Sequence, residues 1–279
     1  MSEAEKNIDT KEFGSNVIMH DFFDRHGEKG VSTQTSHTEL SDKGRENSLE
    51  RGRNFKGKVI KTYSSDTDRT IETGHLVSEG SSADRKLTHR VRDDLGFHED
   101  EKGVFFQEAM RIKKECLGDD FEQQSDAEKN RRKRLSSQGQ IDYFLTFGDK
   151  RPDPGTNSPV ETAANFAYVV DRHFKMVDKL KSGSDIDLVN ISHDFPISCF
   201  LSEVLVRQDG DKEIRGFKKI EEIGGPIDFN EGFELLIQTD GSGNKLTKIL
   251  FRNQEYQIDT KRLKELVEIA KKLKEKQEK

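Results

Sequence analysis

Short hydrophobic runs alternate with charged stretches of helical spacing along the first third of the chain. Residues 16–23 (NVIMHDFF) and 58–65 (KVIKTYSS) are rich in β-branched and aromatic side chains, which predicts two strands. Residues 41–55 and 65–80 follow them with apolar side chains at helical spacing. The pattern therefore predicts two strand–helix units and a layered α/β fold.

Polar residues mark where the predicted helices begin. Ser41 is the expected N-cap of the first helix, and Ser65 or Asp66 that of the second, because these side chains accept hydrogen bonds from the first backbone N–H groups. Glu161, near the start of a later helix, is expected to take a capping role.

The C-terminal half also predicts both helices and strands. Residues 161–183 have the apolar stripe of an amphipathic helix, and residues 185–196 predict a third strand and its loop. Residues 196–205 predict a buried helix, and residues 233–251 alternate about an Asp-Gly turn as in a β-hairpin. Residues 259–279 predict a highly charged final helix.

These elements predict one three-layer α/β/α domain over residues 15–260, with a mostly parallel central sheet. Residues 1–14 are polar and acidic and predict a flexible tail. Residues 85–160 mix helical patches with charge runs and predict a helical or irregular cap, and residues 261–279 add the charged C-terminal helix.

Composition narrows the class of protein. The chain has 279 residues, of which 31% are hydrophobic and 36% charged, so one core is covered by a strongly charged surface. The net charge of −6 argues against a general nucleic-acid binder, and residues 128–134 (EKNRRKR) have the pattern of a solvated helix face. Cys116 and Cys199 form neither a disulfide framework nor a metal-ligand spacing.

No apolar run reaches the roughly 20 residues that span a bilayer, and the first residues lack the features of a signal peptide. We therefore expect a soluble, cytoplasmic protein without a membrane partner.

Three predicted strands each end in ionisable side chains. Arg25 and His26 follow the first strand, Arg69 lies just after the second, and His193 and Asp194 follow the third. Ligands of open α/β sheets bind at the carboxyl ends of the strands, so these groups should converge. Guanidinium forks and helix N-termini suit a dianionic phosphoryl group. The pattern therefore predicts a phosphate-binding site.

Four motifs carry a resemblance to a known family. They are RHGE at residues 25–28, LSDKGRENS at 40–48, SSDTDRTIETG at 64–74 and DLVNISHD at 187–194. In this order they resemble the histidine phosphatase superfamily, which includes phosphoglycerate mutases and acid phosphatases. The resemblance covers most of residues 16–205 and implies a phosphoglycerate mutase-like fold.

The resemblance also implies roles. His26 would attack phosphorus and form a phosphohistidine, while Arg25, Arg69 and His193 bind the phosphoryl oxygens. No metal or other cofactor is required, because the cationic side chains take its place.

The proton donor to the leaving group has two candidates by resemblance. Asp194 matches the His-Asp motif of the acid phosphatase branch, whereas residues 90–97 (RVRDDLGF) match the mutase branch and point to Asp93, with Glu99 a weaker option. Asp194 is the preferred choice.

We expect a phosphatase that hydrolyses phosphomonoesters, with a mutase or a non-catalytic phosphate-binding module as alternatives. The substrate would be a phosphorylated small molecule or a phosphoprotein. The hairpin at residues 233–251 offers an edge through which a homodimer would form.

Overall fold

The computed structural model of the protein describes residues 12–30 and 37–277, so most of the predicted N-terminal tail lies outside the described residues. Within them, nine strands form a single sheet in the order β3-β2-β4-β1-β7-β8-β9-β5-β6. The strands are β1 (Ile18–Arg25), β2 (Val59–Ser64), β3 (Arg85–Val91), β4 (Asp185–Ser192), β5 (Leu205–Asp209), β6 (Lys212–Arg215), β7 (Gly232–Thr239), β8 (Lys245–Phe251) and β9 (Gln254–Ile258).

The sheet has a parallel and an antiparallel half. Strands β3, β2, β4 and β1 pair in parallel, and β1 pairs antiparallel with β7, which begins the antiparallel half. The α/β class with a central sheet is thus confirmed, but the expectation of a mostly parallel sheet is wrong, because five of the eight strand pairs in the described residues are antiparallel. The predicted first, second and third strands are β1, β2 and β4, so the strand ends that the sequence singles out all belong to the parallel half.

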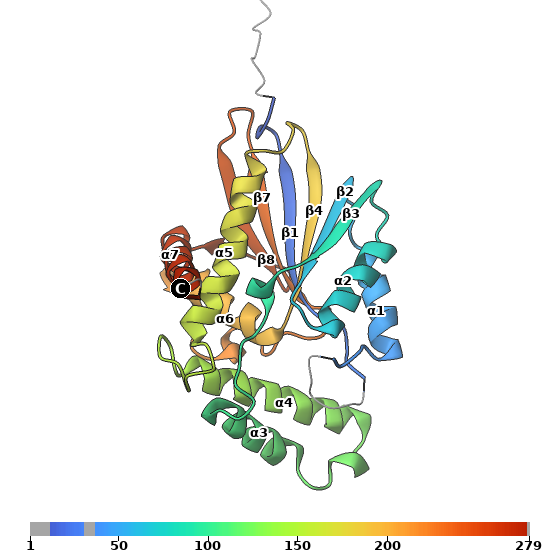
Figure 1. Ribbon diagram of the computed structural model, residues 1–279, viewed down its shortest axis with the longest axis vertical. Coiled ribbons are helices and arrows are strands. Elements are labelled where there is room, and N and C mark those ends of the chain that lie inside the picture. Colours follow the sequence, from blue (N-terminus) through green and yellow to red (C-terminus); the bar gives the residue numbers. More distant parts are fainter. Residues whose placement is uncertain (1–11, 31–36, 278–279) are drawn as a thin grey trace, which may run out of the picture.

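Helices cover both faces of the sheet (Figure 1). The helices of the described residues are α1 (Asp42–Gly52), α2 (Asp68–Gly80), α3 (Val104–Leu117), α4 (Asp126–Leu145), α5 (Pro159–Val177), α6 (Asp194–Val204) and α7 (Thr260–Gln277). Alternating residues of β1 point to opposite sides. Phe23 joins the larger core beneath α5, α6 and α7, whereas Phe22 packs on a smaller cluster with Phe55 and Val77 beside α1 and α2. Two apolar clusters on opposite faces produce the three layers.

The helix caps follow the predictions in part. Ser41 is the N-cap of α1, where its hydroxyl accepts from the Gly44 N–H. Helix α5 begins with a capping box between Ser158 and Glu161, as expected for Glu161. The predicted cap of α2 is wrong: Thr67 is the N-cap, and its side chain makes no capping bond. The Ser65 hydroxyl instead bonds to His193.

Residues 85–160 divide into two parts. The first seven residues form β3, an edge strand of the sheet. Further along, α3 and α4 pack on each other below the carboxyl ends of the parallel strands (Figure 1). The basic run at 128–134 lies on α4, where Arg131 and Arg132 pair with Glu128 and Arg134 pairs with Asp228. It is a charge-paired helix face.

Two C-terminal elements pack more closely with the rest of the domain than the sequence predicts. Strands β7 and β8 lie inside the sheet, so the hairpin does not offer a free edge, and the edges are β3 and β6. Helix α7 packs against α5 and buries Leu263, Leu266 and Ala270 in the main core. The final helix thus belongs to the domain.

Replacement of Phe23 by alanine tests the main core. Its ring is fully buried, with centroids 4.8 Å from Phe166 and 5.0 Å from Phe233. We expect Phe23→Ala to lower the free energy of unfolding by about 3–5 kcal/mol in urea titrations. Phe13→Ala, at a ring that is 49% exposed, should change it by no more than about 0.5 kcal/mol. Equal losses would contradict this assignment of the core.

Candidate active site

Parallel pairing of β1 with β4 brings His26 and His193 together. Arg25 pairs in register with Ser192, so His26 and His193 leave the same end of neighbouring strands. The His26 N–H donates to the Ser192 carbonyl at 3.0 Å, and the imidazole centroids lie 5.2 Å apart. Both side chains are buried. The structure thus unites two histidines that are 167 positions apart in the sequence.

Arg69 connects the two imidazoles from the first turn of α2. Its Nε lies 3.3 Å from His26 Nε2, and its Nη2 lies 3.5 Å from His193 Nδ1. His26, the predicted nucleophile, therefore forms one cluster with Arg69 and His193, two of the three residues predicted to bind the phosphoryl group.

One hydrogen bond defines the tautomer of His26. Its Nδ1 lies 2.7 Å from the carbonyl oxygen of Gly27, which can only accept, so the hydrogen is on Nδ1. The lone pair of the neutral ring is then on Nε2, which lies on the Arg69 side. Burial, followed by the charges of His193, Arg25 and Arg69, lowers the pKa of His26 well below its ordinary value. His26 is accordingly neutral, with Nε2 as its basic atom.

His193 is held from behind by hydroxyl groups. Its Nε2 lies 3.0 Å from Ser65 Oγ, and Ser65 Oγ lies 2.9 Å from Thr70 Oγ1. This is the reason why Ser65 does not cap α2. Burial and the guanidinium groups of Arg69 and Arg25 lower the pKa of His193 well below its ordinary value.

Arg25 is fixed by three groups. Its Nη1 donates to the Ile227 carbonyl at 2.6 Å and lies 3.2 Å from Asp194 Oδ2, and its guanidinium stacks 4.2 Å from the centroid of Phe229. The ion pair places Asp194 beside the site. Asp194 also accepts a hydrogen bond of 2.9 Å from Ser137 of α4, so its carboxylate links the cap to the catalytic layer.

The other predicted proton donor is placed differently. The Asp93 side chain is 74% exposed, and its carboxylate lies 3.7 Å from His98 Nε2. Among the residues that the structure describes, no hydrogen bond or ion pair joins its side chain to Arg25, His26 or His193. The structure thus does not bring Asp93 into the cluster.

Two further ionisable groups lie within electrostatic reach of Arg69. Glu99 is exposed at the surface, and partial loss of hydration, followed by the charge of Glu101, raises its pKa to about 7. Burial, then the charges of Arg69 and Lys113, lowers the pKa of Lys29 to about 8. The sequence suggests Glu99 only weakly and does not suggest Lys29, although Lys29 directly follows the RHGE motif.

The loop before β7 completes the site and is missed by sequence reasoning. The Asn230 N–H donates to the Arg25 carbonyl at 3.1 Å, and Phe229 lies 5.7 Å from His26 between ring centroids. Arg252 anchors this loop through the carbonyls of Ile223, Gly225 and Pro226. Its only sequence signal is the turn-rich segment GGPIDFNEG at 224–232.

The loop that carries His26 also touches α1 closely. A Cβ atom on Gly44 would lie 2.1 Å from the Glu28 carbonyl oxygen, so only glycine allows this approach. The Ser41 N–H donates to the same carbonyl at 2.9 Å. The start of α1 thereby fixes the loop that carries His26.

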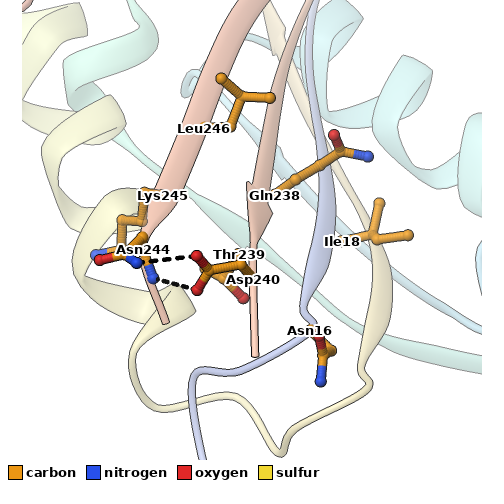
Figure 2. A pocket seen from close by; sticks show the side chains of 8 residues that line it. All are labelled: Asn16, Ile18, Gln238, Thr239, Asp240, Asn244, Lys245 and Leu246. Carbon is orange, nitrogen blue, oxygen red and sulfur yellow. Dashed lines mark hydrogen bonds between the residues drawn. The ribbon is translucent and has the colours of Figure 1, made fainter. Parts of the chain in front are cut away.

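A separate hollow lies at the opposite end of β1 (Figure 2). Asn16 and Ile18 line it together with the β7–β8 turn, where Asn244 bonds to Asp240. Its lining lacks the cluster of Arg25, His26, Arg69 and His193.

Among residues 12–30 and 37–277, no group of three His, Cys, Asp or Glu side chains is arranged to hold a metal ion, and no helix is long and apolar enough to cross a membrane.

Comparison with known proteins gave results only for solved structures; no family model and no curated protein matches the chain. In fold, the chain is similar to histidine phosphatases. A mycobacterial glucosyl-3-phosphoglycerate phosphatase is 16% identical, with 83% of this chain and 95% of that chain covered and a TM-score of 0.47.

A phosphoserine phosphatase of Entamoeba histolytica is 14% identical, with 88% and 99% coverage and a TM-score of 0.47. The protein histidine phosphatase SixA is 11% identical, with 86% and 97% coverage and a TM-score of 0.35. At these identities and TM-scores, the function proposed below rests on the geometry of the site.

The lowered histidine pKa values predict acid sensitivity. The unfolded chain takes up protons at about pH 6.5, before folded His26 and His193 do, so the free energy of unfolding should fall as the pH drops below about 6.5. His26→Gln should flatten this decline in urea titrations at several pH values.

A histidine with the opposite shift supplies the control. A hydrogen bond to Glu234 raises the pKa of His20, so protonated His20 stabilises the folded state at low pH and loses this effect as the pH rises. His20→Gln should therefore steepen the acid decline. Identical slopes for the wild-type protein and His26→Gln would contradict the neutral assignment of His26.

Proposed function

We propose that the chain is a phosphatase of the histidine phosphatase superfamily, which hydrolyses phosphomonoesters through a phosphohistidine on His26. The observation that carries this proposal is the hydrogen bond from His26 Nδ1 to the Gly27 carbonyl, which leaves the Nε2 lone pair beside Arg69. A neutral, oriented imidazole next to two guanidinium groups is the arrangement that nucleophilic attack on a phosphoryl dianion requires.

The first chemical step transfers the phosphoryl group to the protein. His26 Nε2 forms a bond to phosphorus while the ester P–O bond breaks, and a carboxylic acid gives its proton to the leaving oxygen. Arg25 and Arg69 attract the phosphoryl oxygens, and His193 Nδ1 lies on the same side. The Arg69–His26 bond of 3.3 Å is long, so a phosphoryl oxygen can replace it at little cost.

The second step returns the site to its starting state. Water attacks phosphorus, the P–N bond breaks, and the carboxylate formed in the first step accepts a proton from the water. Inorganic phosphate leaves, and His26 is neutral again. The positive charge needed for both steps comes from the side chains of the site, so the mechanism requires no metal ion.

Electrostatics favours Glu99 over Asp194 as the proton donor. Asp194 is paired with Arg25 at 3.2 Å and accepts a hydrogen bond from Ser137, so its carboxylate is already engaged in holding Arg25. The raised pKa of Glu99, about 7, lets it carry a proton at neutral pH. We therefore assign proton transfer to Glu99 and the positioning of Arg25 to Asp194, which revises the sequence-based preference for Asp194.

Loss of the nucleophile is the direct test. His26→Ala should abolish release of phosphate from 4-nitrophenyl phosphate in EDTA, and Arg69→Gln should lower kcat by about 10²–10³-fold. His75→Ala, at an exposed histidine of α2, should retain activity. Full activity of His26→Ala would rule out the phosphohistidine mechanism. Wild-type binding of phosphate without turnover would favour a binding module.

Leaving-group dependence separates the two carboxylates. Glu99→Gln should slow hydrolysis of alkyl phosphates by about 10²–10⁴-fold but affect 4-nitrophenyl phosphate much less, because nitrophenolate leaves without a proton. It should also remove the fall in rate that the wild-type enzyme shows as the pH rises past about 7. Asp194→Asn should slow both substrates to a similar extent. The reverse pattern would make Asp194 the donor.

A further inference from the structure

The two histidines of the site are held by different kinds of partner. His26 Nδ1 bonds to the Gly27 carbonyl, which can only accept, so the position of the ring hydrogen is fixed. His193 Nε2 lies 3.0 Å from the hydroxyl oxygen of Ser65, and a hydroxyl group can either donate or accept. The hydrogen of neutral His193 can therefore lie on either ring nitrogen while Nε2 keeps a partner.

A chain of hydroxyl groups leads from His193 to the start of α2. Ser65 Oγ lies 2.9 Å from Thr70 Oγ1, and Thr70 Oγ1 donates to the carbonyls of Thr67 at 2.8 Å and Ser65 at 3.1 Å. The side chains of Ser65 and Thr70 are fully buried. An unpaired polar group is costly at such a position, so each hydroxyl hydrogen has to point to a partner within the chain.

The direction of this chain sets the hydrogen of His193 in the free site. Because carbonyl groups take the hydrogen of Thr70, Ser65 is the donor in its contact with Thr70. Ser65 then accepts from His193, which places the ring hydrogen on Nε2. The opposite side of the ring agrees, because Arg69 Nη2 can only donate and lies 3.5 Å from His193 Nδ1. Two separate contacts thus leave the lone pair on Nδ1.

A bound phosphoryl group makes the opposite demand on Nδ1. Its oxygens accept hydrogen bonds, so they repel a lone pair on Nδ1 and attract an N–H group there. When Nε2 releases a proton to water and Nδ1 takes one up, the charge of the His193 ring does not change. The Ser65 hydroxyl then turns its hydrogen from Thr70 to Nε2, while Thr70 keeps its bond to the Thr67 carbonyl. Every buried donor keeps an acceptor in both states.

We propose that His193 exchanges its tautomer when a phosphoryl group binds, and that the hydroxyl pair of Ser65 and Thr70 permits this exchange. The hydrogen lies on Nε2 in the free protein and on Nδ1 in the complex. This inference rests on the proposed function and makes Ser65 and Thr70 positioning residues that act through His193. His26 has a carbonyl as its partner and keeps its hydrogen on Nδ1 in both states.

Nitrogen NMR spectra of the imidazole rings test the inference, because a ring nitrogen that bears a hydrogen resonates far from one that bears a lone pair. The wild-type protein is titrated with inorganic phosphate in EDTA at neutral pH, and the two rings are assigned with His26→Gln and His193→Gln. The pattern of His193 should change from the Nε2–H to the Nδ1–H form at saturation. The pattern of His26 should stay in the Nδ1–H form and serves as an internal control.

Variants of the hydroxyl chain test the mechanism without a ligand. Thr70→Val removes the acceptor of Ser65, whose hydrogen then goes to His193 Nε2, so the free protein should already show the Nδ1–H form. Thr70→Ser retains the hydroxyl group and should behave like the wild-type protein. Thr67→Val is the matched control, because its hydroxyl oxygen lies 3.0 Å from Thr70 Oγ1 but outside the path to His193. It should retain the exchange.

The outcomes separate this inference from the proposed function. An Nδ1–H form of His193 in the free wild-type protein, or wild-type spectra of Thr70→Val, would overturn the inference. A doubly protonated His193 in the phosphate complex would also overturn it, because the ring would then take up a proton instead of exchanging one. Hydrolysis of 4-nitrophenyl phosphate is measured separately. Turnover by a wild-type protein whose His193 keeps one tautomer would end the inference alone, whereas exchange without turnover would contradict only the proposed function.

Discussion

Parallel pairing of β1 with β4 is the constraint on which the site depends. It places the end of one strand beside the end of another, with Arg25 level with Ser192, so that His26 and His193 follow at adjacent positions. A shift of one residue in this register would turn alternate side chains to the opposite face and separate the two imidazoles. The buried apolar residues of both strands hold the register, and through it the core determines the geometry of the chemistry.

Concentrated positive charge is the second constraint. Arg25 and Arg69 lie close enough for their charges to oppose each other, and burial together with these charges keeps both histidines neutral. Asp194 and the Ile227 carbonyl offset part of this repulsion at Arg25. The proposed phosphoryl group would relieve the remaining repulsion when it binds.

Segments distant in sequence supply the walls of the site. Helix α4 reaches it through Ser137, and the loop before β7 reaches it through Phe229 and Asn230. The charge of Glu99, in the segment before α3, acts on Arg69. Each contacts or lies near the strand ends without belonging to them. The strand-end cluster and the surrounding walls therefore come from different parts of the chain.

Local sequence determined the elements of the parallel half and the identity of its central residues. The apolar strands β1, β2 and β4, the Ser41 cap and the four motif residues Arg25, His26, Arg69 and His193 follow from patterns within a few positions. Such patterns depend on side-chain periodicity and backbone capping, which neighbours in sequence control.

Only the tertiary structure determined which polar side chains pair with one another. Asp21 appears as a charge interrupting an apolar strand, yet it is buried against His173 and Asn190 at 2.8 and 2.7 Å. Ser65 has the pattern of a helix cap but binds His193, and Glu99 acquires its raised pKa from a crowded position that no local pattern records. Hydrogen bonds and charge interactions depend on distance in space, so a chain read in order cannot specify which of its polar groups will meet.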